Sequence, residues 1–355
     1  MEDAYTVLAE KHRHGESELY KNYLKVLINN EEVDLVAALP AAEEELAQRL
    51  GKSPGEIKII IQGLFEKGVL YKTKKGWVFA RSMEQMHDAS LCDVRQDKVW
   101  GDKLKDAWRE FEDKEYGDHM VRQATEVWPG PIWRILPELR SIAPGETILP
   151  LESTEAILQT AYRIAVASCP CQRSMRRSSR KRELEVCMQF NRGADYHIER
   201  GSGKEITKEE ALKIIEKAAD SGLIHSTFNQ PGAVPTSICN CDPDCCVVYY
   251  KMMEAGTLDK ATDKSRFLSK VDLDLCSGCR LCVDDCPFGA LKMVEKDEVE
   301  IAEVDMEKCM GCGLCTLVCP DDAIKLVAVR PPEHLPQVPT AFEDYGWTSE
   351  GKTKE

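Results

Sequence analysis

Two cysteine runs with the same spacing constrain the fold of this sequence more than any other feature. In each run three cysteines are separated by two residues, and a fourth follows after three further residues, directly before a proline. The runs are Cys276, Cys279, Cys282 and Cys286, then Cys309, Cys312, Cys315 and Cys319. Structural zinc sites usually take their cysteines from separated pairs, so an evenly stepped triplet that occurs twice argues against zinc.

The two runs resemble the bacterial-type ferredoxin domain with two [4Fe-4S] clusters, over residues 266–330. In that family the fourth cysteine of each run ligates the cluster of the other run. The resemblance therefore implies one cluster held by Cys276, Cys279, Cys282 and Cys319, and a second cluster held by Cys309, Cys312, Cys315 and Cys286. It also implies a function in single-electron transfer.

Similar segments flank both runs, which predicts a pseudo-twofold domain of short strands and small helices. Val271 and Val304 stand at equivalent positions before the runs, and Ala290 and Ala323 follow them. Between residues 270 and 330 there are 7 Lys and Arg against 13 Asp and Glu. An acidic surface of this kind favours docking against a basic partner protein.

The 355-residue chain has a net charge of −14 and contains 16 cysteines. This charge argues against nucleic acid as the dominant partner. We expect no signal peptide, so the many cysteines indicate metal clusters in a reducing cytoplasm, in a host that we expect to be anaerobic. No apolar run approaches the ~20 residues of a membrane span, and we expect no membrane insertion.

We expect residues 1–14 to be a polar leader and residues 15–90 to form a winged-helix-like domain. Apolar residues at helical spacing predict three helices, and two short strands follow at 69–71 and 77–79. The third helix is neutral, and only the wing is basic, through Lys72, Lys74, Lys75 and Arg81. Because phosphate contacts need positive charge, we expect this domain to bind protein or to act as a scaffold, and not to bind DNA.

Residues 91–160 are predicted to be a helical connection rich in proline and tryptophan. Four apolar side chains share one helical face and are expected in the core: Trp100, Leu104, Trp108 and Phe111. The stretch 128–150 carries five prolines and is expected to be an extended surface connection. Cys92 stands alone in this part of the sequence, which favours a buried free thiol.

Residues 161–265 are expected to form a central Cys-rich α/β module. A strand at 163–167 should lead into the first of its cysteines, Cys187 falls on an expected helix, and Thr207 with Glu210 predicts a capping box. The seven cysteines of this module are Cys169, Cys171, Cys187, Cys239, Cys241, Cys245 and Cys246. A zinc site would use four of them and leave three spare.

This layout resembles uncharacterised multi-cluster iron–sulfur proteins of anaerobes, which place such a module before a ferredoxin domain. We expect at least one further iron–sulfur cluster, with the seven cysteines as its candidate ligands. A fourth cluster or a non-cubane cluster stays open because Cys245 and Cys246 are adjacent. His197 and His225 are candidate non-cysteine ligands of such a cluster, although an ordinary polar side chain is the simpler interpretation of each.

The segment 172–182 contains six basic residues and no acidic one. One interpretation is a charged run exposed to solvent. The other is a functional segment, which would favour reduction of a nearby cluster, or bind an acidic partner or a phosphate-bearing cofactor. We favour a functional role. The last segment, 331–355, has few apolar residues and is expected to be an extended tail.

These features together predict an α+β multidomain chain. We expect an iron–sulfur electron-transfer module of a larger cytoplasmic oxidoreductase, working with other redox subunits such as a flavoprotein. The sequence has neither a G-x-G-x-x-G motif after a strand nor a P-loop, so substrate chemistry is expected on another subunit. The alternatives are a cluster-containing redox-sensing DNA-binding regulator, and an oxidoreductase with an open-site catalytic cluster in the central module.

Overall fold

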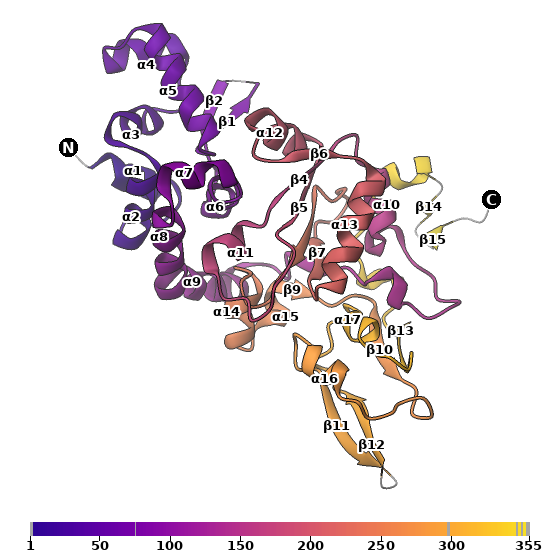
Figure 1. Cartoon of the computed structure of the whole chain (residues 1–355). Coiled ribbons are helices and arrows are strands. Elements are labelled where there is room, and N and C mark those ends of the chain that lie inside the picture. Colours follow the sequence, from indigo (N-terminus) through magenta and orange to yellow (C-terminus); the bar gives the residue numbers. More distant parts are fainter. Residues whose placement is uncertain (1–2, 75, 297–298, 346, 349–350, 353–355) are drawn as a thin grey trace. The chain divides into compact units, whose positions relative to one another are not determined.

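The computed structural model describes residues 3–74, 76–296, 299–345, 347–348 and 351–352. These residues form two compact units (Figure 1). The first unit comprises Met1–Asp118, Ala167–Arg176 and Tyr196–Lys204, and the second comprises His119–Val166, Arg177–Asp195 and Glu205–Glu355. None of the described helices is long and apolar enough to cross a membrane.

The first unit is mainly helical, with one antiparallel hairpin. Its helices are α1 (Ala4–Lys11), α2 (Glu18–Leu27), α3 (Asn30–Ala37), α4 (Glu43–Leu50), α5 (Pro54–Glu66), α6 (Met83–Leu91), α7 (Asp97–Trp100), α8 (Lys103–Phe111) and α11 (Pro170–Met175). The hairpin pairs β1 (Leu70–Thr73) with β2 (Gly76–Phe79). The predicted order of three helices and a hairpin is present in α2, α4, α5, β1 and β2, whereas α3, between the first two of these helices, was not predicted. Membership of the winged-helix class stays a prediction, and Lys75 of its wing lies outside the described residues.

The segment predicted as a polar leader is instead folded into the first unit. Residues 4–11 form α1, and Tyr5, Leu8 and Ala9 are buried on one side of it. These three positions follow helical spacing, and the Tyr5 hydroxyl donates a hydrogen bond to the Ile28 carbonyl at 2.8 Å. The few apolar side chains of a polar segment are therefore enough to anchor it.

Aromatic side chains form the centre of the first unit. Trp108 on α8 is fully buried, and its ring packs edge-on against Tyr23 of α2 and Phe111. The predicted apolar face is thus confirmed for Leu104, Trp108 and Phe111, while Trp100 belongs to the separate helix α7. Cys92 is also buried, as predicted.

The second unit is built on a seven-stranded sheet. The strand order is β6-β4-β5-β8-β7-β3-β9. The strands are β3 (Trp133–Ile135), β4 (Ile164–Ser168), β5 (Glu185–Phe190), β6 (Lys204–Ile206), β7 (Ile224–Phe228), β8 (Ser237–Cys241) and β9 (Thr262–Asp263), of which β4 and β6 cross the boundary between units. The helices are α9 (Gly117–Arg122), α10 (Thr154–Gln159), α12 (Arg192–Arg200), α13 (Lys208–Asp220), α14 (Tyr249–Glu254) and α15 (Leu258–Ala261), of which α9 and α12 cross the boundary between units.

Two sequence predictions about this sheet need correction. Cys187 lies on strand β5 and not on a helix, because the segment 185–190 alternates between buried and half-buried positions as strands do. The proline-rich stretch 128–150 is not only a surface connection, since Trp133–Ile135 forms β3 between β7 and β9. The capping box of Thr207 and Glu210 is confirmed at the start of α13.

One face of this sheet packs on helices α10 and α13. Met188 of β5 and Ile238 of β8 are fully buried in that core, together with Ile215 of α13. Leu335 and Phe342 join the same core, so part of the tail is anchored instead of lying extended. Several other tail residues (346, 349–350 and 353–355) lie outside the described residues.

The C-terminal part of the second unit has two similar halves. Strand β10 (Phe267–Val271) pairs with β13 (Ile324–Ala328), and β11 (Leu291–Lys296) pairs with β12 (Val299–Val304). A short helix begins one residue before the third cysteine of each triplet, α16 (Leu281–Asp285) in the first half and α17 (Leu314–Leu317) in the second. A buried ion pair between Arg266 and Glu152 (2.9 Å) joins β10 to the segment before α10.

Candidate functional site

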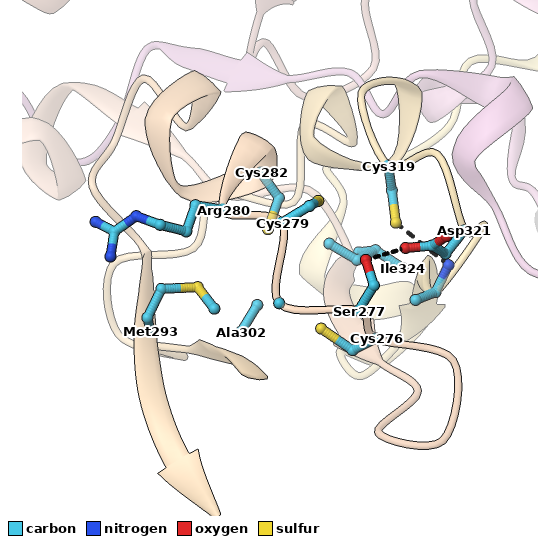
Figure 2. Close-up of a pocket in the computed structure, with 12 residues that line it drawn as sticks. Cys276, Ser277, Cys279, Arg280, Cys282, Met293, Ala302, Cys319, Asp321 and Ile324 are labelled. Atoms are coloured by element: carbon cyan, nitrogen blue, oxygen red, sulfur yellow. Dashed lines mark hydrogen bonds between the residues drawn. The ribbon is translucent and has the colours of Figure 1, made fainter. Parts of the chain in front are cut away.

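The first of two cysteine-lined cavities lies between the loop before α16 and the loop after α17. It encloses about 300 Å³, partly open to solvent. Figure 2 shows Cys319 entering from the loop after α17, while Cys276, Cys279 and Cys282 come from the other half. These are the four cysteines that the ferredoxin resemblance assigns to one cluster. Cys282 is buried, whereas Cys279 is exposed.

The second cavity repeats this arrangement with the halves exchanged. It encloses about 280 Å³ and is lined by Cys309, Cys312, Cys315 and Cys286, together with Phe288 and Ser269. Three of its cysteines, Cys309, Cys312 and Cys315, are buried. The cysteines of this cavity are therefore more shielded from water than those of the first.

Glycines allow the backbone to pass close to both cavities. Gly278 has φ +72°, and a Cβ atom there would lie 2.4 Å from the Glu300 carbonyl oxygen. Gly311 has φ +69°, and a Cβ would lie 2.3 Å from the carbonyl oxygen of Phe267. Since side chains are disfavoured at positive φ and no Cβ fits in either place, only glycine suits both positions.

The electrostatics of the thiols show the same grouping as the cavities. Burial raises the pKa of Cys282 to about 11, and the neighbours that raise it further are Cys319, Cys279 and Cys276. Burial raises the pKa of Cys315 to about 12, although a hydrogen bond with Ser269 (3.2 Å) opposes this rise. A bound iron would stabilise the thiolate form that burial alone disfavours.

The residues of both cavities fit a cubane cluster. Among the residues that the structure describes, no three Cys, His, Asp or Glu side chains lie as close together as the ligands of one metal ion do. A [4Fe-4S] cluster does not need such closeness, because each of its four thiolates binds a different iron. Four sulfurs around a cavity with closely approaching backbone are the donor set that such a cluster requires.

Comparison with known families agrees with this geometry. The model of a 4Fe-4S dicluster domain matches residues 275–323. No curated protein matches the chain. The match and the clustered cysteines support [4Fe-4S] clusters in a ferredoxin-type domain near the C-terminus, and with them an iron–sulfur electron-transfer role.

The seven central cysteines are divided between the two units. Cys169 and Cys171 belong to the first unit, where Cys169 directly precedes α11 and Cys171 lies in its first turn. The other five belong to the second unit: Cys187 on β5, Cys239 and Cys241 on β8, and Cys245 and Cys246 between β8 and α14. A ligand role for any of the seven stays a prediction.

The strand register puts three of these five cysteines on one face of the sheet. Met188 of β5 is paired with Ile238 of β8, and both point into the core beside α13. Cys187 directly precedes Met188, and Cys239 directly follows Ile238. Because neighbouring side chains on a strand point to opposite faces, Cys187 and Cys239 lie on the other face of the sheet. Cys241, two residues after Cys239, shares that face.

The following loop brings further groups to this cysteine-bearing face. Hydrogen bonds with Cys239 and Cys246 raise the pKa of the buried Cys241 thiol, and burial raises it further. The Ser226 hydroxyl on the adjacent strand β7 lies 3.6 Å from Sγ of Cys241. Cys239, Cys241 and Cys246 therefore form one group of neighbouring thiols.

Sequence reasoning missed Tyr249, which lies beside these thiols. Its side chain is 1% exposed, and burial raises its pKa, with Cys241, Cys246 and Cys239 adding to the rise. Ser226 is near enough to lower that pKa, yet the Tyr249 hydroxyl has no hydrogen-bond partner within normal distance among the described residues. Its only sequence signal is its place three residues after Cys246 at the start of α14.

The two histidines considered as ligands have ordinary polar contacts. His225 contacts Asn240 at 2.5 Å and Glu138 at 3.2 Å. His197, in the first unit, contacts Ser202 at 3.0 Å and lies 3.8 Å from Sγ of Cys92. Neither contact set includes any of the seven central cysteines.

Several arginines of the basic segment 172–182 form ion pairs with acidic residues of the same chain. In the first unit Arg173 pairs with Asp97 (2.8 Å), and Arg176 pairs with Asp102. In the second unit Arg180 pairs with Asp285 of α16 and donates to the Asp284 carbonyl at 3.1 Å. At these positions the segment therefore pairs with acidic residues of its own unit, while Arg176 and Arg180 remain partly exposed.

Proposed function

We propose that this chain is an electron-transfer module of a larger cytoplasmic oxidoreductase. A [4Fe-4S] cluster supplies a centre that gains or loses one electron at a time. One cluster would be held by Cys276, Cys279, Cys282 and Cys319, and the other by Cys309, Cys312, Cys315 and Cys286. The observation that carries this proposal is the pair of cavities, each lined by one cysteine triplet and the fourth cysteine of the other run.

The first cavity is the end at which we expect a redox partner to dock. Cys279 is exposed there, and two apolar side chains close to it in the chain are also exposed, Leu275 at 52% and Leu281 at 48%. Acidic residues surround this apolar surface, including the exposed Asp272 and Asp274. A redox subunit with an apolar patch and a basic rim, such as a flavoprotein, would complement it.

The proposal also includes at least one further iron–sulfur cluster in the central module. The second unit has five central cysteines, of which four lie within residues 239–246 and three are buried, and this exceeds what packing requires. A third centre would lengthen the electron path through the chain, while substrate chemistry would take place on the partner.

The experiment is a reductive titration of the anaerobically purified full chain, followed by transfer to the redox partner that co-purifies from the native host. We expect single-electron reduction of both ferredoxin clusters and re-oxidation by the partner. Leu275→Asp with Leu281→Asp should slow transfer at least tenfold, whereas Val127→Asp, at an exposed apolar residue outside this surface, should not. Equal rates in both variants would contradict the docking surface, and absence of any reducible cluster would contradict the function.

A further inference from the structure

The central cysteines of the second unit gather where the sheet face and the following loop meet. Cys187, Cys239 and Cys241 share the face opposite α13, and Cys246 of the loop hydrogen-bonds with Cys241. Cys241 is 9% exposed and Cys246 is 5% exposed. Cys187 and Cys239 are half-buried. Four thiols that come from two strands and a loop form a donor set of the kind that holds a cluster.

A buried hydroxyl marks the same place. Tyr249 lies beside Cys239, Cys241 and Cys246, and its hydroxyl has no hydrogen-bond partner within normal distance among the described residues, although Ser226 is near enough to lower its pKa. Leaving a buried hydroxyl unsatisfied costs about 1–3 kcal/mol, so such groups usually have a partner that the protein atoms alone do not reveal. A cluster sulfide or a ligating thiolate would supply the acceptor.

Tyr249 also contacts a residue that lines the second ferredoxin cavity, Phe288. Its ring lies edge-on to that of Phe288, with centroids 6.4 Å apart and an interplanar angle of 76°. Phe288 lines the second cavity and is absent from the lining of the first. The central cysteines and the second cavity are therefore separated by one pair of aromatic rings.

The basic segment holds these two regions together. Ser179 donates from its backbone N–H and its hydroxyl to Asp244, at 3.1 and 3.0 Å, in the loop between Cys241 and Cys245. The next residue, Arg180, pairs with Asp285 on α16, between Cys282 and Cys286. Two consecutive residues thus connect the central loop to the helix that carries ferredoxin cysteines.

We propose that Cys187, Cys239, Cys241 and Cys246 hold an additional iron–sulfur cluster, that Tyr249 donates a hydrogen bond to it, and that its electron-transfer neighbour is the second ferredoxin cluster. This inference rests on the proposed electron-transfer function. One electron leaves the reduced second cluster and is taken up by the oxidised central cluster, without transfer of a proton or formation of a bond. The redox partner docked at the first cavity supplies or removes that electron.

The ligand set is tested by iron and sulfide analysis of the full chain, purified anaerobically. Two cubanes contain about eight irons, and the wild type should contain more than that. The double variant Cys241→Ser with Cys246→Ser should lose about four irons if the central cluster is a cubane. Cys92→Ser, at a buried cysteine of the first unit, is the control and should lose none. Retention of both ferredoxin EPR signals in the double variant shows that it has folded.

Three results would overturn the ligand set: about eight irons in the wild type, unchanged iron in the double variant, or zinc in place of iron. None of them would affect the two ferredoxin clusters, so failure of this inference is distinguishable from failure of the proposed function. Loss of the ferredoxin signals themselves in the wild type would instead contradict that function.

The neighbour relationship is tested by EPR line broadening of the central signal. Reduction of an adjacent cluster should broaden that signal in the wild type and in Cys276→Ser, which lacks a ligand of the first cluster. The broadening should be lost in Cys309→Ser, which lacks a ligand of the second. The reverse pattern would overturn the assignment of the second cluster as the neighbour.

The role of Tyr249 is tested by the variant Tyr249→Phe, which keeps the ring and removes the hydroxyl. Loss of a hydrogen-bond donor disfavours the more negative reduced state, so the midpoint potential of the central cluster should fall while both ferredoxin potentials stay unchanged. An unchanged central potential would overturn the hydrogen bond. Tyr250→Phe, at the neighbouring half-buried tyrosine, is the matched control and should not shift it.

Discussion

Sγ of Cys286 accepts a hydrogen bond from the backbone N–H of Ala290 at 3.3 Å. In the other half, Ala323 donates to Sγ of Cys319 over the same distance. Each fourth cysteine is therefore held by the residue four positions later, although it lines the cavity of the other run. This exchange ties the two halves together, so neither cavity can be completed by one half alone.

The exchange predicts where a cysteine substitution takes effect. We expect Cys286→Ser to damage the cluster of Cys309, Cys312 and Cys315, and to spare the one whose triplet is nearer in sequence, because a serine oxygen is a poor substitute for the thiolate. By the same reasoning, Cys319→Ser should damage the cluster of Cys276, Cys279 and Cys282. Cluster-resolved EPR of the reduced proteins measures this, and loss of the nearer cluster in each variant would contradict the assignment.

The glycine at position 311 predicts a steric effect on the second cavity. Gly311→Ala would place a Cβ atom against the Ser265 hydroxyl and the Phe267 carbonyl, in a backbone conformation that side chains disfavour. The strain should cost roughly 1–3 kcal/mol and reduce the iron content of the second cluster. Gly289→Ala is the control, because it has similar positive φ but open space around its Cβ. Equal iron content and thermal stability in the two variants would refute the steric argument.

His197 predicts a pH dependence of the stability of the first unit. Burial, helped by the positive charge of Arg200, lowers the pKa of His197 to about 3. The unfolded chain has a histidine pKa of about 6.5, so it binds a proton below that pH while the folded unit does not. The stabilisation is fully present above about pH 6.5 and declines as the pH falls towards 3, by up to about 1.4 kcal/mol per pH unit.

Urea unfolding of the first unit at several pH values measures this effect, with amide exchange in α12 as the probe. His197→Gln removes the titrating group, so its stability should fall less steeply between pH 6.5 and 4 than that of the wild type. Because other groups titrate in both proteins, the difference between them is the quantity to compare. Parallel curves would show that His197 is not the cause.

The surface of α5 predicts that the first unit does not bind DNA. Ile59 on this helix is 75% exposed, and its other exposed residues include Lys58, Gln62 and Glu66. An apolar and nearly neutral face suits a protein contact and can neutralise few phosphates. The full chain should show no micromolar binding to mixed-sequence duplex at low salt. Tight binding with a steep salt dependence would favour the regulator alternative.

The cysteine motif allowed the ferredoxin region to be predicted because its constraints are local. The spacing of Cys276, Cys279 and Cys282 is set by one turn of backbone, so it is visible in the sequence without knowledge of the fold. Capping at Thr207 could be predicted for the same reason, since it depends on Glu210 three residues later. Burial of Cys92 could be predicted because a lone free cysteine is usually buried.

The parts that could not be predicted depend on tertiary contacts. Cys187 was assigned to a helix although the apolar residues Val186, Met188 and Phe190 alternate with others as in a strand; so short an alternation becomes decisive only through pairing with β8, about fifty residues later in the chain. Residues 4–11 are polar on most sides, and only the partners of Tyr5 and Leu8 make the segment part of a core. Tyr249 could not be singled out because its importance lies in what it contacts.

The most direct test of the account is a quantitative EPR titration of the anaerobically purified full chain. Stepwise reduction should produce spin-coupled signals from two [4Fe-4S] clusters, because the two cavities share a buried core that contains both Cys282 and Cys315. Cys276→Ser and Cys309→Ser should each remove one signal and leave the other uncoupled. The account would be contradicted if neither cavity bound iron. It would also be contradicted if the single variants Cys276→Ser and Cys309→Ser each kept both signals and a signal was lost only in the double variant.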